Sequence, residues 1–351
     1  MRWELEPDLA AFAARVRPLL ETNILNNVVA TVVAGTVQGQ LRMSPPVLAV
    51  GVGDDGAVQA AALRTAPWPM LCTPVDPDDA ETLVDLWLEY DRELPGINAL
   101  LDTARSVGSA WSRRTGGSEH CRTAMAMHSL SAVVEPPRPG AGQLVTATEA
   151  DRDLALSWWS DFVDESHVID GGPETRAATV DFRIAAGHLF LWRDRGESVS
   201  LVSTNPAVAG VVRIGPVYTP PEARRRGYAS SAVAAVSQDA LDAGAHTCML
   251  YTDLANPTSN KIYADVGYRR IAEWEERVFT HRQPANVMNP SVSRSTRRTS
   301  PMASASRTAA SFPGRVRTTT GHSGVCSRAT AIASRVASAA SPRPWTAGVK
   351  R

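Results

Sequence analysis

Apolar residues recur at helical and strand spacing over the first 280 residues or so, and they predict two successive sets of elements. In the first set, the spacing of Leu9, Phe12, Val16 and Leu19 predicts a helix over residues 8–34, with a possible kink at Pro18. Strands at 47–52 and 57–63, helices at 78–90 and 100–113, and a strand near 123–134 follow. Residues 51–56 fit the pattern Gly-x-Gly-x-x-Gly, but Asp-Asp-Gly between two strands indicates a hairpin turn, because the aspartates oppose a phosphate.

The second set begins with a helix that ends in the segment 158–167. A strand over 209–219 follows later, then an alanine-rich helix from Tyr228 to Ala243, which Gly244 ends. Residues 246–252 favour a buried strand, and a short helix carrying Tyr263 precedes a last strand that starts at Gly267-Tyr268.

The charge of the chain is unevenly distributed, although the 351 residues have no net charge. Residues 284–351 hold eleven basic residues and no Asp or Glu, which leaves an acidic body of 25 basic against 36 acidic residues in 1–283. This tail is rich in Ser, Thr, Ala, Arg and Pro and has no sustained apolar period, so we expect 283–351 to be disordered. Its arginines allow a nucleic-acid arm, but with only Phe312 and Trp345 for stacking we favour a non-functional extension.

A basic turn between the strand ending near Thr219 and the helix at Tyr228 predicts an anion site. Arg224, Arg225 and Arg226 follow one another without an acid, and Gly227 lets the backbone approach a ligand closely. The next helix starts with small residues, and its first amides have no partner within the helix. Such a helix start binds phosphate groups.

The spacing Arg224-x-x-Gly227-x-Ala229 resembles the acyl-CoA pyrophosphate loop of the GCN5-related N-acetyltransferase (GNAT) family, Gln/Arg-x-x-Gly-x-Gly/Ala. A solvated turn that caps a surface helix would give the same six residues. The later segment decides between these interpretations, because Asn256, Tyr263 and Gly267-Tyr268 resemble the second signature of the family in the right order. The resemblance covers residues 142–282.

The resemblance implies an α/β (α+β) fold with a mixed, mostly antiparallel sheet flanked by helices, and acetyl-CoA as co-substrate, with no metal. It implies that the backbone near Val217, Tyr218 and Thr219 pairs with the pantetheine arm, and that Asn256 and Asn260 brace the short helix and the cofactor. It makes Tyr263 the candidate general acid for the departing thiolate. The residues expected to bind the diphosphate are Arg224, Arg225, Arg226, Gly227, Tyr228, Ala229 and Ser230.

Each of these residues also has a purely structural interpretation. Tyr263 has the spacing of a half-buried core residue, and Asn256-Pro257 is a good start for a helix. The general base is not evident, because the strand at 209–219 holds no carboxylate where the family often places a Glu. Glu165 and His167 are candidates for the base or for part of the acceptor site, with solvated helix-end charges as the alternative.

Residues 1–138 resemble a shortened, degenerate copy of the same fold, ahead of the catalytic domain 142–282. The turn before its helix at 78 reads Thr-Pro-Val-Asp-Pro-Asp-Asp over residues 73–79, which should repel a diphosphate. We therefore expect this half to pack against the active one and to shape the acceptor site.

The sequence thus predicts an N-acetyltransferase that moves an acetyl group from acetyl-CoA to an amine of a small molecule or a peptide. A protein amine as acceptor and a non-catalytic acyl-CoA sensor remain alternatives, and a homodimer is open. The four cysteines lack metal-ligand spacing, so neither zinc nor disulfides are expected. The absence of a signal peptide and of a membrane-spanning apolar run favours a soluble, cytoplasmic protein without a membrane partner.

Overall fold

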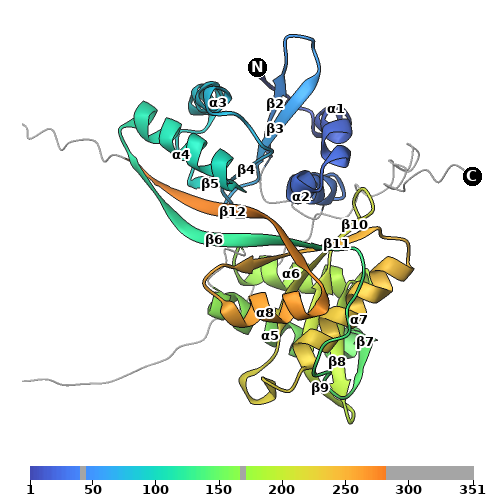
Figure 1. The fold of residues 1–351 in the computed structure, drawn as a ribbon. Helices are drawn as coiled ribbons and strands as arrows, with labels where there is room; N and C mark the ends of the chain where they lie inside the picture. The colour runs from blue at the N-terminus through green and yellow to red at the C-terminus, as the bar shows by residue number, and fades with distance from the viewer. Residues whose placement is uncertain (40–44, 167–170, 282–351) are drawn as a thin grey trace, which may run out of the picture. The chain divides into compact units, whose positions relative to one another are not determined.

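The computed structural model describes residues 1–39, 45–166 and 171–281, and the two halves of this region repeat one order of elements (Figure 1). The N-terminal half, residues 1–138, holds β1 (Arg2–Leu5), α1 (Leu9–Thr22), η1 (Ile24–Asn26), α2 (Asn27–Val37), β2 (Val47–Val52), β3 (Val58–Arg64), β4 (Met70–Cys72), α3 (Pro77–Tyr90), β5 (Gly96–Leu100), α4 (Leu101–Thr115) and β6 (Ser118–Leu130). The C-terminal half, from residue 142, holds β7 (Gln143–Thr146), η2 (Glu149–Asp151), α5 (Arg152–Ser166), α6 (Pro173–Ala185), β8 (Leu189–Asp194), β9 (Glu197–Thr204), β10 (Val211–Tyr218), η3 (Pro221–Ala223), α7 (Tyr228–Asp242), β11 (Thr247–Asp253), α8 (Pro257–Val266) and β12 (Arg269–Thr280). Leaving the short η turns aside, both halves read strand, two helices, three strands, helix, strand, helix, strand.

The halves share one twelve-stranded sheet because their last strands are exchanged. Its order is β1-β2-β3-β4-β5-β12-β6-β11-β10-β9-β8-β7. Strand β6 of the N-terminal half pairs with β11, while β12 of the C-terminal half pairs with β5 and with β6. Most neighbours are antiparallel, and the parallel pairs β4–β5 and β10–β11 occupy equivalent places in the two halves. The mixed, mostly antiparallel α/β fold predicted from the sequence is confirmed.

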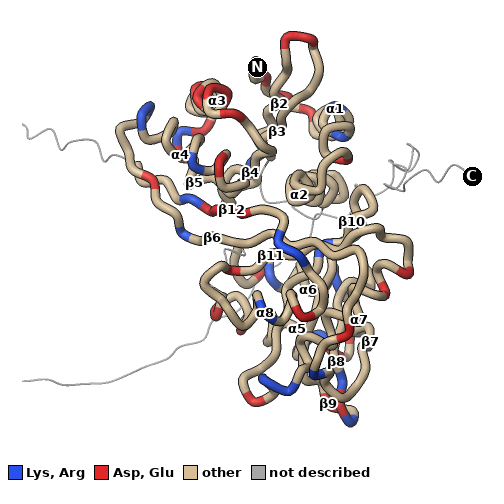
Figure 2. Tube along the Cα trace, viewed as in Figure 1, with Lys and Arg blue, Asp and Glu red and all other residues tan. Residues whose placement is uncertain are grey.

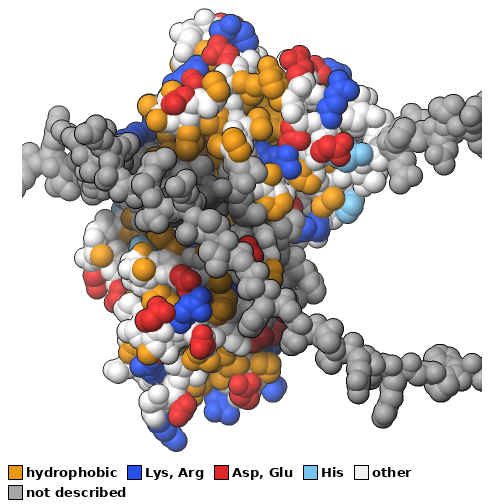
Figure 3. All heavy atoms as spheres, turned by 180° about the vertical axis from the view of Figure 1, so that it is seen from behind, with side chains coloured by type: hydrophobic (Ala, Val, Ile, Leu, Met, Phe, Trp, Pro, Cys, Tyr) orange, Lys and Arg blue, Asp and Glu red, His pale blue; other side chains and the backbone are white. Residues whose placement is uncertain are grey.

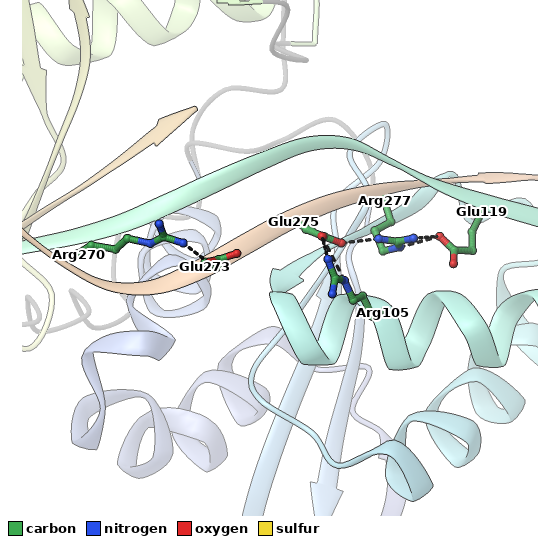
Figure 4. A network of polar contacts seen from close by, with 6 residues as sticks. All are labelled: Arg105, Glu119, Arg270, Glu273, Glu275 and Arg277. Carbon is green, nitrogen blue, oxygen red and sulfur yellow. Dashed lines mark hydrogen bonds and ion pairs between the residues drawn. The ribbon is translucent and has the colours of Figure 1, made fainter. Parts of the chain in front are cut away.

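A buried carboxylate fastens the exchanged strand β12 to the N-terminal half (Figure 4). Glu275 is 3% exposed, and its Oε1 lies 2.8 Å from the guanidinium of Arg105 on α4. Its other oxygen accepts from Arg277, which also reaches Glu119 on β6 at 2.5 Å. One cluster of charged side chains therefore joins β12, α4 and β6.

Helix ends follow the residue types that the sequence supplies. Pro77 opens α3, and Asn256 caps α8 by accepting a hydrogen bond from the Ser259 amide at 3.1 Å. Gly267 ends α8 in a left-handed conformation, with φ of 105°. These boundaries agree with the sequence prediction, as do the β2–β3 hairpin and α7.

The helix predicted over residues 8–34 is wrong as a single element. The chain forms α1 with Pro18 inside it, becomes extended at Asn23, and then starts a new helix after a single 3-10 turn. The Asn23 side chain accepts a hydrogen bond from the Leu25 amide at 3.0 Å, which offers the backbone an alternative to the helix. The interruption therefore lies at Asn23, where a polar side chain caps the next turn, and not at the proline.

Two hydrophobic clusters cover opposite faces of the sheet in the C-terminal half. One joins α7 and α8 to residues such as Val212, Cys248 and Leu250, and the other joins α5 and α6 to Leu191 and Leu201. Small residues on the buried face of α7, among them Ala232 and Ser237, let this helix approach the strands closely. The strand ends around β10 are thereby fixed between two helical layers.

The tail that the sequence predicts to be disordered, 283–351, lies outside the described residues. In the part of the chain that is described, no helix combines the length and the apolar character needed to cross a membrane.

Candidate functional site

The pairing between strands β10 and β11 ends in the middle of β10. Their parallel pairing runs from Val211 to Arg213, opposite Thr247 to Met249, and goes no further. Beyond it, β10 pairs with β9 alone, through Ile214, Val217 and Tyr218. In the sheet as described, one edge of the final β10 residues therefore offers backbone groups to an extended ligand, as predicted for Val217, Tyr218 and Thr219.

The turn after β10 leads into the start of α7 through a run of backbone amides without hydrogen-bond partners among the described residues. None of the amides of residues 225–230 makes a hydrogen bond to another described residue. Arg225 and Arg226 are exposed and form no ion pair within the described region, and Arg225 has a positive φ of 65°. The charge view shows this turn as a basic segment, in contrast to the acidic start of α3 (Figure 2). Amides and guanidinium groups of this kind suit a diphosphate.

Gly227 is required by the chain itself as well as by the proposed ligand. It has a φ of 81°, and a Cβ at this position would lie 2.3 Å from the carbonyl oxygen of Arg138 and 2.8 Å from the Gly140 amide nitrogen. The segment that connects the halves therefore packs directly on the turn. The reason given from the sequence, close approach of a ligand, is incomplete.

Arg224 is occupied within the protein. Its guanidinium lies 2.7 Å from Glu165 at the end of α5 and 5.8 Å from the ring centre of Tyr218, and its Nε donates to the Thr219 carbonyl at 2.8 Å. The Tyr218 hydroxyl donates to Glu165 at 3.3 Å. This cluster holds the end of β10 against α5, so Glu165 lies beside the predicted donor site but is already paired.

The remaining residues predicted in the turn use their side chains internally. Tyr228 is buried and donates to Asp194 at 2.7 Å, and the Ser230 hydroxyl donates to the Gly227 carbonyl at 2.9 Å. Tyr228 and Ser230 can therefore offer a ligand their backbone amides but not their side chains, and Ala229 likewise offers its amide.

Tyr263 on α8 and Val217 on β10 pack against the same hydrophobic cluster below α7. The Tyr263 ring meets that of Tyr268 edge to face, with centroids 6.1 Å apart, and burial raises the pKa of Tyr263 to about 12. Its hydroxyl makes no hydrogen bond to a described residue, whereas that of Tyr268 lies 2.8 Å from the Ser237 hydroxyl. A neutral phenol without a protein partner can donate a proton to a ligand.

The two asparagines predicted to brace α8 have local partners. Asn256 is the helix cap, and Asn260 accepts from Thr252 at the end of β11 and donates to the Asp253 carbonyl at 3.2 Å. They fix α8, and with it Tyr263, relative to the end of β11.

The structure adds one titratable residue that the sequence did not indicate. His128 on β6 is buried beside β11, opposite Leu250, its Nδ1 has no partner among the described residues, and burial lowers its pKa. It comes from the other half through the strand exchange, which local spacing does not reveal. Of the two candidate bases predicted from the sequence, Glu165 and His167, His167 lies outside the described residues.

The corresponding strand ends in the N-terminal half carry acidic side chains, and the Met1 ammonium lies 3.1 Å from Asp79 among them. A cavity of about 530 Å³ lies where β4 and β5 lead into α3 and α4, and it is lined by Asp76, Asp79 and Asp102. Asp76 and Asp79 of this lining belong to the acidic turn at 73–79, for which repulsion of a diphosphate stays a prediction.

Three further observations concern the rest of the described surface. A cavity of about 640 Å³ lies at the opposite ends of β10 and β11, where Val211 and Thr247 contribute to its wall. The rear view shows acidic and basic side chains interspersed, not the single-sign surface that favours nucleic acid (Figure 3). Among the residues described, no group of three or more His, Cys, Asp or Glu side chains could hold a metal ion.

Comparison with known proteins is consistent with this geometry. Residues 199–278 match the family model described as FR47-like protein. The chain is similar to an acetyltransferase of the GNAT family from Colwellia psychrerythraea, with a TM-score of 0.54 and 9% identity over 80% of this chain and 100% of that one. It is also similar to a GCN5-related N-acetyltransferase from Sphaerobacter thermophilus, with a TM-score of 0.53 and 13% identity over 81% and 96%.

A Drosophila protein has a TM-score of 0.57 and 14% identity over 79% of this chain and 98% of that one. At such low sequence identities the similarity concerns the fold alone. The matched region covers about 80% of this chain, which is more than either half. None of the curated proteins matches the sequence.

Proposed function

Because this chain has the fold of the GCN5-related N-acetyltransferases, we propose that it transfers an acetyl group from acetyl-CoA to an amine. The observation that carries the proposal is the free edge of β10 leading to the unpartnered amides of residues 225–230. A ligand with an extended amide-bearing arm and a diphosphate fits both features at once. Arg225 and Arg226 supply the positive charge, since Arg224 is paired with Glu165.

In the proposed reaction the neutral amine attacks the thioester carbonyl, a C–N bond forms and the C–S bond breaks. The departing thiolate takes a proton from the Tyr263 hydroxyl, and the nitrogen gives up its proton to a base or to water. The raised pKa of Tyr263 keeps the phenol protonated at neutral pH. Asn256 and Asn260 support this step by holding α8 at the end of β11.

We propose further that the N-terminal half is a degenerate second copy that shapes the acceptor side. The repeated element order and the equivalent parallel pairs support a duplication. Val28 on α2 packs in one cluster with Val211 on β10 and Met249 on β11, with Ile24 and Leu25 against it. The first half therefore covers one face of β10 and β11 next to where they separate.

Two alternatives remain tied to specific observations. A non-catalytic acyl-CoA sensor is favoured by the absence of a carboxylate from β10 and by the pairing of Glu165 with Arg224. An acetyltransferase that acts on a protein amine keeps the same donor site and differs in the acceptor alone.

Free thiol release from acetyl-CoA, measured with the full chain and a panel of small amines and lysine peptides, separates these functions. The proposal expects thiol release that depends on an amine, with the preferred amine identifying the acceptor class. Binding of acetyl-CoA without amine-dependent release would support the sensor.

A further inference from the structure

Two guanidinium groups in the C-terminal half share a single neutral acceptor. Arg183 on α6 donates to the Asn205 side-chain oxygen at 3.2 Å, and Nε of Arg213 on β10 lies 3.4 Å from the same atom. Asn205 follows β9 directly. One neutral amide oxygen thus lies within hydrogen-bond distance of two positively charged guanidinium groups.

Neither arginine has an acidic partner among the described residues. Burial lowers the pKa of both, and the charge of Arg213 lowers the pKa of Arg183 further. Both side chains are half-buried, and a guanidinium that is partly withdrawn from water without an anion is unfavourable, because the neutral groups around it replace only part of its hydration. A carboxylate placed between the two would relieve this cost and accept charge-assisted hydrogen bonds.

The two arginines differ in what else they hold. Arg183 donates to the Thr204 carbonyl and to the Ser203 hydroxyl and lies 5.6 Å from the ring centre of Trp159, so it also fastens the end of β9. Within residues 1–39, 45–166 and 171–281, the side chain of Arg213 makes one long bond, to Asn205, and its other donors have no partner there. Arg213 is therefore the residue with capacity for a ligand.

A third donor lies on the neighbouring strand. Tyr251 follows Met249, the partner of Arg213, by two positions, so both β11 side chains point to the same face of the sheet. Its hydroxyl is buried and has no hydrogen-bond partner in the described part of the chain. Tyr251 therefore lies one strand away from Arg213 and two positions beyond its pairing partner.

The position of Arg213 relates this cluster to the donor site. Arg213 is the last β10 residue that pairs with β11, and the free edge of β10 starts directly after it. An arm that runs along this edge from the turn at residues 225–230 reaches its far end beside Arg213. Five residues of strand span about 17 Å, so an anion held by Arg213 sits at the acetyl end, well away from the diphosphate.

We propose that Arg213, with Arg183 and Tyr251, binds the carboxylate of the acceptor, so that the acceptor class is an amino acid or another amine with a nearby carboxylate. This inference rests on the proposed acetyl transfer for its acceptor. Because Arg213 adjoins the acetyl end, the carboxylate and the attacking nitrogen must be only a few bonds apart.

The test compares amino acids with their matched carboxamides, such as alanine with alaninamide, as acceptors in thiol release by the full chain. We expect at least a ~10-fold higher kcat/KM for the acid of the preferred pair. Arg213→Gln should lower kcat/KM for the acid by ~10- to 100-fold and change that for the carboxamide less than ~3-fold. Arg195→Gln, an exposed arginine of the β8–β9 turn, should leave the ratio unchanged.

Equal use of acids and carboxamides by the unmodified chain, or an equal loss for both with Arg213→Gln, would overturn the inference. If Arg213→Gln does not fold, Tyr251→Phe replaces it, and the acid preference should then fall ~3- to 10-fold. An unchanged preference in Tyr251→Phe would count against the site.

A binding measurement distinguishes this inference from the proposed function. Calorimetric titration with N-acetylalanine and N-acetylalaninamide needs no turnover, and we expect only the acid to bind in a manner that depends on Arg213. If no amine leads to thiol release, the proposed acetyl transfer is rejected. Binding of N-acetylalanine that depends on Arg213 would still support the anion site. Absence of such binding would reject the site even if acetyl transfer occurs.

Discussion

The carboxylate of Glu165 at the end of α5 lies 2.7 Å from the guanidinium of Arg224 in the turn before α7. Both side chains are largely exposed, at 50% and 41%, so the pair adds little stability, about 1 kcal/mol or less. Its consequence is positional, because it fixes the end of β10 and removes Glu165 from the groups free to accept a proton.

Glu165→Gln should therefore change kcat by less than ~3-fold, since a paired carboxylate contributes little as a base. Glu222→Gln, an exposed acid in η3, is the control. A fall in kcat by ~100-fold or more with unchanged acetyl-CoA affinity would instead identify Glu165 as the general base predicted from the sequence.

Tyr263→Phe should lower kcat by ~10²-fold while the Kd for acetyl-CoA, measured by calorimetry, stays within about twofold. The substitution keeps the ring packed against Tyr268 and removes the proton that the thiolate needs. Tyr268→Phe is the matched control, since its hydroxyl bonds to Ser237 and should affect stability alone. Full turnover in Tyr263→Phe would exclude this phenol as the acid.

The raised pKa of Tyr263 predicts a pH effect on stability. The folded state binds the phenolic proton more tightly than the unfolded state, whose pKa is near 10, so the contribution is complete below pH 10 and is lost as the pH rises towards 12. Urea unfolding between pH 9 and 11 should show a shallower decline for Tyr263→Phe than for the unmodified chain. Identical slopes would mean that Tyr263 titrates normally.

Gly227→Ala should weaken acetyl-CoA binding ~10-fold or more and also destabilise the fold, because the new methyl group meets the Arg138 carbonyl and strains the backbone. Gly244→Ala provides the comparison, since it also has a positive φ but no atom within 4 Å of its added Cβ. If both variants bind acetyl-CoA equally well, the turn does not form the diphosphate site.

Glu275→Gln should destabilise the protein by about 3 kcal/mol or more, measured by urea unfolding, because Arg277 loses a buried partner. Glu273→Gln breaks the exposed Arg270–Glu273 pair, also drawn in Figure 4, and should cost about 1 kcal/mol at most. Equal effects would indicate that Glu275 does not fasten the exchanged strand.

Local patterns predicted the parts of the site that depend on neighbouring residues. The turn at Gly227, the start of α7 and the cap at Asn256 follow from residue types a few positions apart. The exchange of β6 and β12 depends on pairing between residues more than a hundred positions apart, which periodicity does not encode. The same holds for Arg183 and Arg213, whose shared contact requires α6, β9 and β10 to be in place.

Short elements were missed for a different reason. β4 spans only Met70–Cys72, too few residues to show an alternating pattern. Yet it pairs in parallel with β5 and so completes the repeat of the β10–β11 arrangement in the N-terminal half. The correspondence of the halves becomes visible only once the sheet is assembled.

The most direct test of the account is free thiol release by the full chain from acetyl-CoA, with and without amines. We predict that thiol release requires an amine and that its rate falls ~10²-fold in Tyr263→Phe. We also predict that the protein binds acetyl-CoA more weakly when Arg225 and Arg226 are both changed to Gln. Saturable binding of acetyl-CoA with no amine-dependent release would contradict it.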